Sequence, residues 1–271
     1  MTRTRGLLSL LPVLAILSVV PAGAQEPARR FEEVRTYPAP EAKQGVAVDA
    51  RYFYAIDNHA IAKYDRRTGA RVAEWKGEDG GPIIHLNSCI VLKGQLICSH
   101  SNYPGVPMVS SIEIWRTSDL KHIESRSFGI YEGSLTWTIR AKGDWWLAFA
   151  NYGNAAGTPG HGPEWTTLVR FDRVWNRKAA YTFPPELTKR FAPNSSSGGN
   201  WGPDGLLYVT GHDEREVYLL RLPEMGSVLE WVETIPVPFG GQAWAFDPAE
   251  RGTIWGIRRG SREVVMARLK E

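Results

Sequence analysis

The chain has 271 residues, a formal net charge of +3 at pH 7 and 43% hydrophobic residues. Its basic residues are spread among acidic ones and form no cluster that alternates with aromatic residues, so the composition argues against nucleic-acid binding. The counts of 11 Trp, 10 Tyr and 27 Gly are high. Aromatic side chains suit pleated sheets and Gly supplies tight turns, so the composition predicts an all-β protein.

The first 24 residues have the pattern of a secretory signal peptide. Arg3 and Arg5 precede an apolar run at residues 7–20, and Ala22-Gly23-Ala24 matches an A-x-A cleavage site. The apolar run is short for a membrane span, which takes about 20 residues. We expect cleavage after Ala24, export to the periplasm or the medium, and a single mature domain at residues 25–271 without a membrane span.

The mature sequence contains a repeat of about 40–50 residues, which is the range of propeller blades. Four units begin near residues 44, 87, 135 and 199, and each predicts two inner strands followed by two outer strands. A fifth unit begins near residue 242 but lacks its outermost strand. Residues 31–37 provide a spare strand, and pairing it with residues 264–269 removes two exposed sheet edges. The sequence therefore predicts a five-bladed β-propeller closed by its N-terminal strand.

The third unit is longer than the others, which leaves six blades as the alternative count. Its surplus lies at residues 153–165 and 184–198. Both segments are rich in Gly, Pro and Ser, so we interpret them as loops.

The two cysteines flank two apolar runs that meet at a predicted Lys93-Gly94 turn. Centring the hairpin on this turn places Cys89 opposite Cys98 in a non-hydrogen-bonded pair, the closer kind of strand pair. Close pairing and export to an oxidising compartment predict a disulfide. Two buried thiols in one strand pair are the alternative.

Polar and aromatic residues recur at one predicted face of the propeller. In this fold, the loop into each innermost strand and the loop out of each second strand lie on the same face. Concave sites combine aromatic walls with a few polar groups, so we expect a small-molecule or glycan ligand there. The tryptophans have packing between blades as their alternative role. The candidate ligand-binding residues are Gln44, Asn87, Asn102, Trp137, Asn151, Tyr152, Trp201, Gln242 and Arg258.

Three histidines and one aspartate on this face are the candidate catalytic residues: His85, His100, His212 and Asp213. Imidazole is a ligand of transition metals, so the three histidines are also candidate ligands of a divalent metal ion as cofactor. Imidazole also transfers protons near neutral pH, with or without a metal. The alternative is that these histidines bond to backbone at blade junctions or line a wet channel.

Two enzyme classes are disfavoured. The predicted face holds few Asp and Glu residues, which argues against a two-carboxylate glycosidase. No G-x-S-x-G motif is present in the sequence, which argues against a serine hydrolase with a nucleophile elbow.

Three segments resemble known propeller families. Residues 43–45 and 65–72 resemble the first blade of the plant-and-bacterial type of glutaminyl cyclotransferase, which implies an exported five-bladed fold. Residues 201–209 resemble a blade of the gluconolactonase and regucalcin family of six-bladed, metal-dependent lactonases. Residues 100–104 and 110–115 resemble bacterial propellers that are called cycloisomerases or are uncharacterised.

These observations favour an exported, monomeric propeller enzyme that acts on a small polar or sugar-derived molecule at the His-rich face. The reaction types that fit are those of a lactonase or other hydrolase, a lyase or a cyclase, with metal assistance left open. A non-catalytic propeller that binds a glycan, a peptide or an envelope protein is the first alternative. A glutaminyl cyclotransferase is the second.

Overall fold

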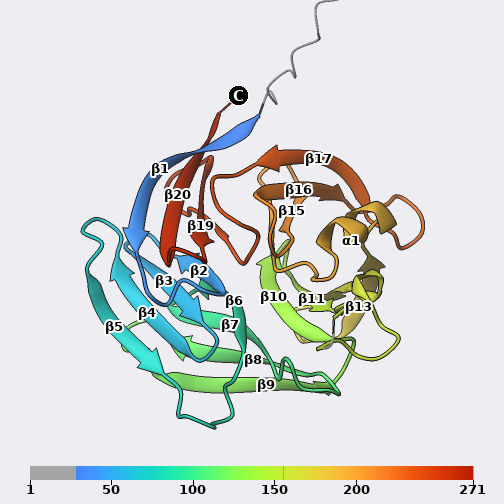
Figure 1. The fold of residues 1–271 in the computed structure, drawn as a ribbon, viewed down its shortest axis with the longest axis horizontal. Coiled ribbons are helices and arrows are strands. Elements are labelled where there is room, and N and C mark those ends of the chain that lie inside the picture. The colour runs from blue at the N-terminus through green and yellow to red at the C-terminus, as the bar shows by residue number, and fades with distance from the viewer. Residues whose placement is uncertain (1–28, 155, 271) are drawn as a thin grey trace, which may run out of the picture.

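The fold is a ring of five small sheets around a central axis (Figure 1). The computed structural model describes residues 29–154 and 156–270, so the predicted signal peptide lies outside the described residues. Each of the five sheets has four antiparallel strands. The prediction of an all-β, five-bladed propeller is therefore confirmed.

The strands follow one another from the centre outward in four of the five blades. Blade 1 consists of β2 (Gly45–Val48), β3 (Tyr52–Asp57), β4 (Ala60–Asp65) and β5 (Arg71–Lys76). Blade 2 consists of β6 (Leu86–Leu92), β7 (Gln95–Ser101), β8 (Val109–Arg116) and β9 (His122–Ile130). Blade 3 consists of β10 (Ser134–Ala141), β11 (Asp144–Ala150), β12 (Thr167–Phe171) and β13 (Arg177–Thr182). Blade 4 consists of β14 (Gly198–Trp201), β15 (Leu207–Thr210), β16 (Glu216–Arg221) and β17 (Glu230–Pro236).

Blade 5 joins the two ends of the chain. It consists of β18 (Ala245–Phe246), β19 (Thr253–Arg258), β20 (Glu263–Lys270) and, outermost, β1 (Arg30–Pro38). Strand β1 runs beside β20 (Figure 1), with Phe31 opposite Leu269 and Tyr37 opposite Val264. The predicted closure by the N-terminal strand is confirmed.

A second seam joins blades 5 and 1 near the axis. Ala243 pairs in parallel with Gly45 of blade 1, and its backbone N–H donates to the carbonyl of Gln44 at 3.2 Å. A Cβ on Gly45 would lie 2.5 Å from the Cβ of Ala243, so only glycine allows this approach. Because residue 243 pairs with blade 1, β18 is shorter than the predicted inner strand at residues 242–246.

The surplus of the third unit contains no additional blade. Residues 153–165 include one short 3₁₀ helix, η1 (Pro163–Trp165), and the described part of this segment has no strand. Residues 184–198 include α1 (Pro185–Phe191), where the sequence predicted only a loop. The helix forms because Leu187 and Phe191, four residues apart, bury against the cluster between blades 3 and 4.

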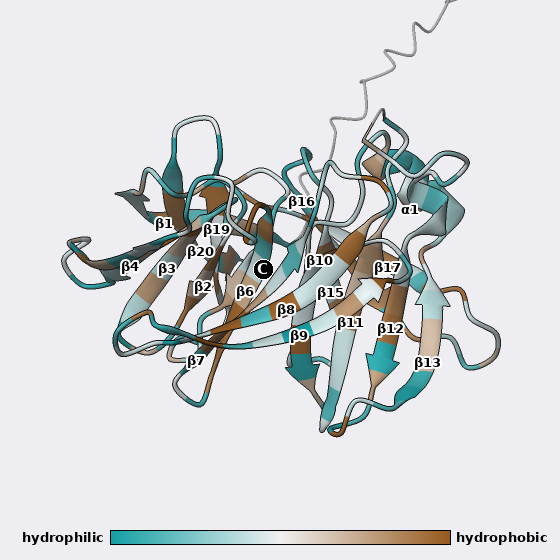
Figure 2. Ribbon diagram, turned by 90° about the horizontal axis from the view of Figure 1, so that it is seen from below, coloured by the Kyte–Doolittle hydropathy of each residue, from teal (hydrophilic) through white to brown (hydrophobic). Residues whose placement is uncertain are grey.

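The hydrophobic core lies between neighbouring blades. Each of the five described clusters joins side chains from two adjacent blades: Tyr54 and Leu86 share the cluster of blades 1 and 2, for example. Figure 2 shows apolar stretches along the strands of the ring. This packing fixes neighbouring blades against each other, so side chains at their junctions have fixed positions.

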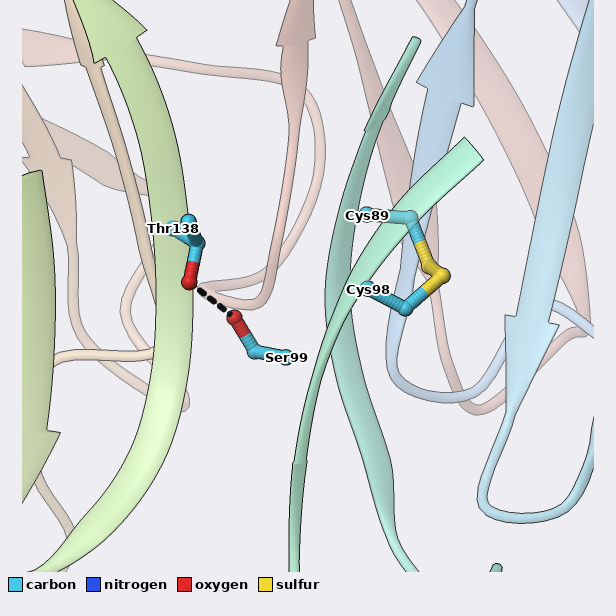
Figure 3. Close-up of a disulfide and its surroundings, with 4 residues drawn as sticks. All are labelled: Cys89, Cys98, Ser99 and Thr138. Carbon is cyan, nitrogen blue, oxygen red and sulfur yellow. Dashed lines mark hydrogen bonds between the residues drawn. A yellow bond between two sulfur atoms is a disulfide. The ribbon is translucent and has the colours of Figure 1, made fainter. Parts of the chain in front are cut away.

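Strand β7 illustrates how side chains alternate between the two junctions of blade 2. The Cys89–Cys98 disulfide joins β6 to β7 with 4.0 Å between Cα atoms, and both cysteines pack in the cluster shared with blade 1. Ser99 points the other way and bonds to Thr138 of β10 at 2.9 Å (Figure 3). The predicted disulfide is confirmed, and it is compatible with export to an oxidising compartment. In the part of the chain that the structure describes, no helix is both long and apolar enough to cross a membrane.

Candidate functional site on the axial face

The predicted convergence of loops on one face is confirmed by strand pairing. The first residues of four inner strands pair with the last or next-to-last residues of the second strands: Gly45 with Ile56, Leu86 with His100, Ser134 with Ala150, and Gly198 with Thr210. We call this side of the ring the axial face. It carries the loops before β2, β6, β10, β14 and β18 and those after β3, β7, β11, β15 and β19.

A three-residue group crosses from blade 4 to blade 5 on the axial face. The imidazole of His212 lies between Asp213, whose Oδ1 is 2.6 Å from Nδ1, and Arg259, whose Nη1 is 3.0 Å from Nε2. A guanidinium only donates hydrogen bonds, so Nε2 is the acceptor and Nδ1 carries the hydrogen. This arrangement fixes a neutral tautomer. Arg259 was not among the predicted site residues.

This group lines a pocket of about 360 Å³. Two predicted ligand-binding residues, Gln242 and Arg258, also line it. Gln242 is buried and donates from Nε2 to the backbone carbonyl of His212 at 3.3 Å, which supports the loop that carries the imidazole. Arg258 donates to the carbonyl of Pro238 at 3.1 Å and pairs with Glu33, so it braces the pocket wall. The structure thus brings four of the predicted residues together around one pocket.

An aromatic group from blades 2 and 3 also lies on this face. The ring centroids of His85 and Tyr103 are 4.9 Å apart, and those of Tyr103 and Tyr152 are 5.0 Å apart. Burial raises the pKa of Tyr152 to about 12, so its phenol is neutral at physiological pH. Tyr152 was among the predicted site residues. Tyr103 was not, although Tyr103 lies in the loop after β7.

The electrostatic environment of His85 is positive. Burial, together with smaller effects of the nearby His100, Arg259 and Lys43, lowers the pKa of His85 to about 4, and a hydrogen bond with Asn87 acts in the opposite direction. His85 is therefore neutral near pH 7, mainly because it is buried, with Arg259 as one of the smaller contributions.

Arg259 differs from the other cations of this face in its partners. Asp57 neutralises both Lys43, at 3.2 Å, and Arg262, at 3.5 Å. Among the described residues, no carboxylate forms an ion pair with Arg259, whose hydrogen-bond partner is the neutral ring of His212. An exposed guanidinium with this environment is suited to bind a carboxylate or phosphate from solution.

His100 does not take part in this pocket. Its Nε2 accepts from the backbone N–H of Ile84 at 3.3 Å, and its Nδ1 is 3.0 Å from Oγ of Ser111. The side chain points to the same junction as Cys98, two residues earlier, and lines a different cavity between blades 1 and 2. The expectation that His100 joins His212 at one catalytic site is wrong for this reason.

The three predicted metal ligands are likewise separated. His85 lies against Tyr103, His100 bonds to Ser111, and His212 is held between Arg259 and Asp213. Among residues 29–154 and 156–270, no group of three or more His, Cys, Asp or Glu side chains is arranged to hold a metal ion. The geometry therefore does not support a metal site built from these three histidines.

The remaining predicted amides form hydrogen bonds within the propeller. Asn87 donates to the carbonyl of Leu135 in the next blade at 2.9 Å. The other three bonds close local loops or link neighbouring ones: Gln44 Nε2 to Asn58 Oδ1 at 2.6 Å, Asn102 Nδ2 to the Pro107 carbonyl at 3.0 Å, and Asn151 Nδ2 to the Glu132 carbonyl at 2.8 Å. These amides shape the axial face by holding its loops.

The two predicted tryptophans pack between blades. Trp137 is fully buried in the cluster of blades 3 and 4 and donates from Nε1 to Oγ of Ser196 at 2.9 Å. Trp201 pairs with Leu207 beside the β14–β15 turn, at the end of the blade away from the axial face, and packs edge-on against Trp146. Both side chains therefore have the packing role that was the alternative, and neither lies at the Arg259 pocket.

Comparison with known proteins identifies the fold. No protein-family model matches the chain, and no curated protein matches its sequence. Among solved structures, the PQQ-bound aldose sugar dehydrogenase of Streptomyces coelicolor is similar with a TM-score of 0.55 and 9% identity, over 90% of this chain and 99% of that one. A luciferin-regenerating enzyme is similar with a TM-score of 0.51 and 12% identity, over 89% of this chain and 96% of that one. These likenesses support the propeller fold and confirm none of the three family resemblances.

Proposed function

We propose that this protein is an exported, monomeric propeller that binds a small, polar, anionic molecule at the Arg259 pocket and acts on it by proton transfer. The observation that carries the proposal is the hydrogen bond from Arg259 to the imidazole of His212, together with the lack of a carboxylate partner for this guanidinium among the described residues. Sugar-derived acids fit a pocket of about 360 Å³ that combines a guanidinium with amide and hydroxyl groups.

Each residue of the group has a role in this proposal. Arg259 binds the carboxylate of the ligand, and its movement toward the ligand releases Nε2 of His212. Asp213 keeps the hydrogen on Nδ1 and stabilises the imidazolium that forms when Nε2 takes a proton from the ligand. A proton taken from a carbon or hydroxyl next to the carboxylate would start a lyase, isomerase or cyclase reaction.

A binding role without catalysis is the second candidate. The side chain of Asp213 is 67% exposed, so water screens its interaction with His212 more than in a closed active site. A protein that captures an acidic glycan or peptide at the axial face needs Arg259 and the neighbouring loops, but it does not need the proton transfer.

Calorimetric titration with a ligand panel tests the proposal. The panel pairs each sugar acid with its neutral parent sugar, and each bound ligand is then assayed for turnover. Arg259→Gln is compared with Arg251→Gln, a matched charge change in the β18–β19 turn at the opposite end of blade 5. We expect acids to bind, and Arg259→Gln alone to weaken them by roughly tenfold or more, the value of one charged hydrogen bond. Equal binding by both variants would reject the site, and binding without turnover would favour the second candidate.

A further inference from the structure

A second cavity, of about 640 Å³, lies between blades 1 and 2 and shares no lining residue with the Arg259 pocket. Strand β5 and the loop after it form one wall, which includes Trp75. Strands β7, β8 and β9 form the other wall, with Ser111, Glu113 and His122. The cavity thus combines an aromatic wall with a polar wall.

The centre of the polar wall is a buried carboxylate. The side chain of Glu113 is 6% exposed, and it accepts hydrogen bonds from Ser111 Oγ at 2.6 Å, His122 Nε2 at 2.8 Å and Ser125 Oγ. These residues face the same way because Glu113 pairs with Cys98 on one side and with Ser125 on the other. Three donors offset much of the cost of removing the carboxylate from water.

All hydrogens of this network point toward Glu113. The backbone N–H of Ile84 donates to Nε2 of His100, so Nδ1 of His100 donates to Ser111, which in turn donates to Glu113. The groups that remain for a ligand are therefore mainly acceptors: a lone pair of the carboxylate and oxygen lone pairs of the serines. Such a wall favours a ligand rich in hydrogen-bond donors and repels anions.

One donor is also available. Ser127 Oγ accepts from the backbone N–H of Gly129 at 3.1 Å, so its own O–H remains for a ligand. A molecule that both donates and accepts matches this set better than an ammonium group, which only donates. Hydroxyl groups have this property.

The aromatic wall is held in a fixed orientation. Trp75 is half-buried and packs against the fully buried Trp115 with 4.8 Å between ring centroids. His122 packs against the same tryptophan at 5.0 Å, so the imidazole and Trp75 are positioned by one buried ring. A rigid indole offers a flat apolar surface to the C–H face of a ring-shaped ligand.

We propose that this cavity binds a neutral sugar unit, independently of the Arg259 pocket. The apolar face of the sugar lies against Trp75, and its hydroxyls bond to Glu113, His122 and Ser127. This site also gives the side chain of His100 a role. His100 donates a hydrogen bond to Ser111, which donates to Glu113, and it does not reach the Arg259 pocket.

Tryptophan fluorescence and calorimetric titrations test this inference near neutral pH with neutral sugars, the corresponding sugar acids and amino sugars. We expect neutral sugars to bind, and Trp75→Leu and Ser127→Ala to weaken them by roughly tenfold and threefold, about the value of a lost stacking surface and a lost hydrogen bond. Trp165→Leu, at the exposed last residue of η1, and Arg259→Gln should leave this binding unchanged.

Three results would overturn the inference. The first is that the wild type binds no neutral sugar at millimolar concentration. The second is that the wild type and both cavity variants bind neutral sugars equally. The third is that only amino sugars bind, which would make the cavity a cation site. Ser127→Ala removes one exposed oxygen and serves as the readout if Trp75→Leu does not fold. Failure here leaves the Arg259 pocket untouched, because the two sites are tested with ligands of different charge.

Discussion

Arg259 donates a hydrogen bond to Nε2 of His212 at 3.0 Å, across the junction of blades 4 and 5. The contact joins the loop after β19 to the loop after β15, so it depends on the packing of blade 5 against blade 4. It places a cation that has no carboxylate partner among the described residues beside a neutral base, and Asp213 holds that base from the other side at 2.6 Å. The proposed anion binding and the proposed proton transfer therefore use the same pocket.

Substitution of His212 should separate binding from chemistry. With a ligand that is turned over, we expect His212→Asn to lower kcat by roughly 10²–10⁴-fold, the usual contribution of a general base, and to change the dissociation constant little. Asp213→Asn should have a smaller effect in the same direction, because it only orients the imidazole. Steady-state kinetics with calorimetry gives both quantities. Unchanged kcat in His212→Asn would contradict the role of the imidazole.

The pH dependence of stability should report on His85. Its pKa of about 4 in the folded protein lies below the value of about 6.5 in the unfolded chain, so the unfolded chain binds more protons between these values. The free energy of unfolding should therefore fall as the pH decreases from 6.5 to 4, by about 3 kcal/mol from this group. Burial also lowers the pKa of His100, which adds to the same trend.

Urea unfolding over this pH range checks the prediction. His85→Gln should flatten the pH dependence while leaving the smaller contribution of His100. The same slope in the variant as in the wild type would show that His85 is not buried as a neutral imidazole.

Most of the fold could be predicted from the sequence because its signals are local. Alternating apolar strands and turns define the blades, and the missing strand near the C-terminus matches the spare strand at residues 31–37. The disulfide follows from counting outward from the Lys93-Gly94 turn, and Cys89 does pair with Cys98. The α1 helix was missed because its stability comes from burial of Leu187 and Phe191 against blades 3 and 4.

The site was predicted only in part, because the loop rule assigns a face to the backbone and not to each side chain. His100 ends a second strand as expected, but the alternation of β7 turns its side chain toward blade 1. Trp201 lies at the other end of its blade. The Glu113 network was missed because it depends on the separate register between β7 and β8, which places Glu113 opposite Cys98.

Closure of the ring should depend on Tyr37. Its ring packs in a tilted orientation against Phe53 of blade 1 at 4.9 Å and stacks on Trp255 of blade 5 at 5.6 Å, and its hydroxyl donates to the carbonyl of Arg66 at 2.6 Å. Tyr37→Ala should lower the free energy of unfolding by about 3–5 kcal/mol, and Tyr37→Phe by about 1 kcal/mol. Denaturant unfolding measures both. The matched control is Val34→Ala, because Val34 is 50% exposed in the same strand. An effect of Tyr37→Ala no larger than that of the control would contradict this closure.

The disulfide should stabilise blade 2. It closes a short loop with a sequence separation of 9 residues, for which the chain-entropy relation gives about 2–3 kcal/mol. Reduction of the wild type should therefore lower its melting temperature, whereas the Cys89→Ser/Cys98→Ser double variant should not respond to reductant. Mass spectrometry after thiol alkylation verifies the redox state. Alkylation of both cysteines in the unreduced, denatured protein would contradict the bond.

The most direct test of the central claim is a crystal structure of the protein with the tightest-binding sugar acid from the ligand panel. The proposed site predicts the carboxylate of the ligand within hydrogen-bond distance of Arg259, with Nε2 of His212 released from the guanidinium and facing the ligand. A sugar acid bound elsewhere, with the Arg259–His212 hydrogen bond intact, would contradict it.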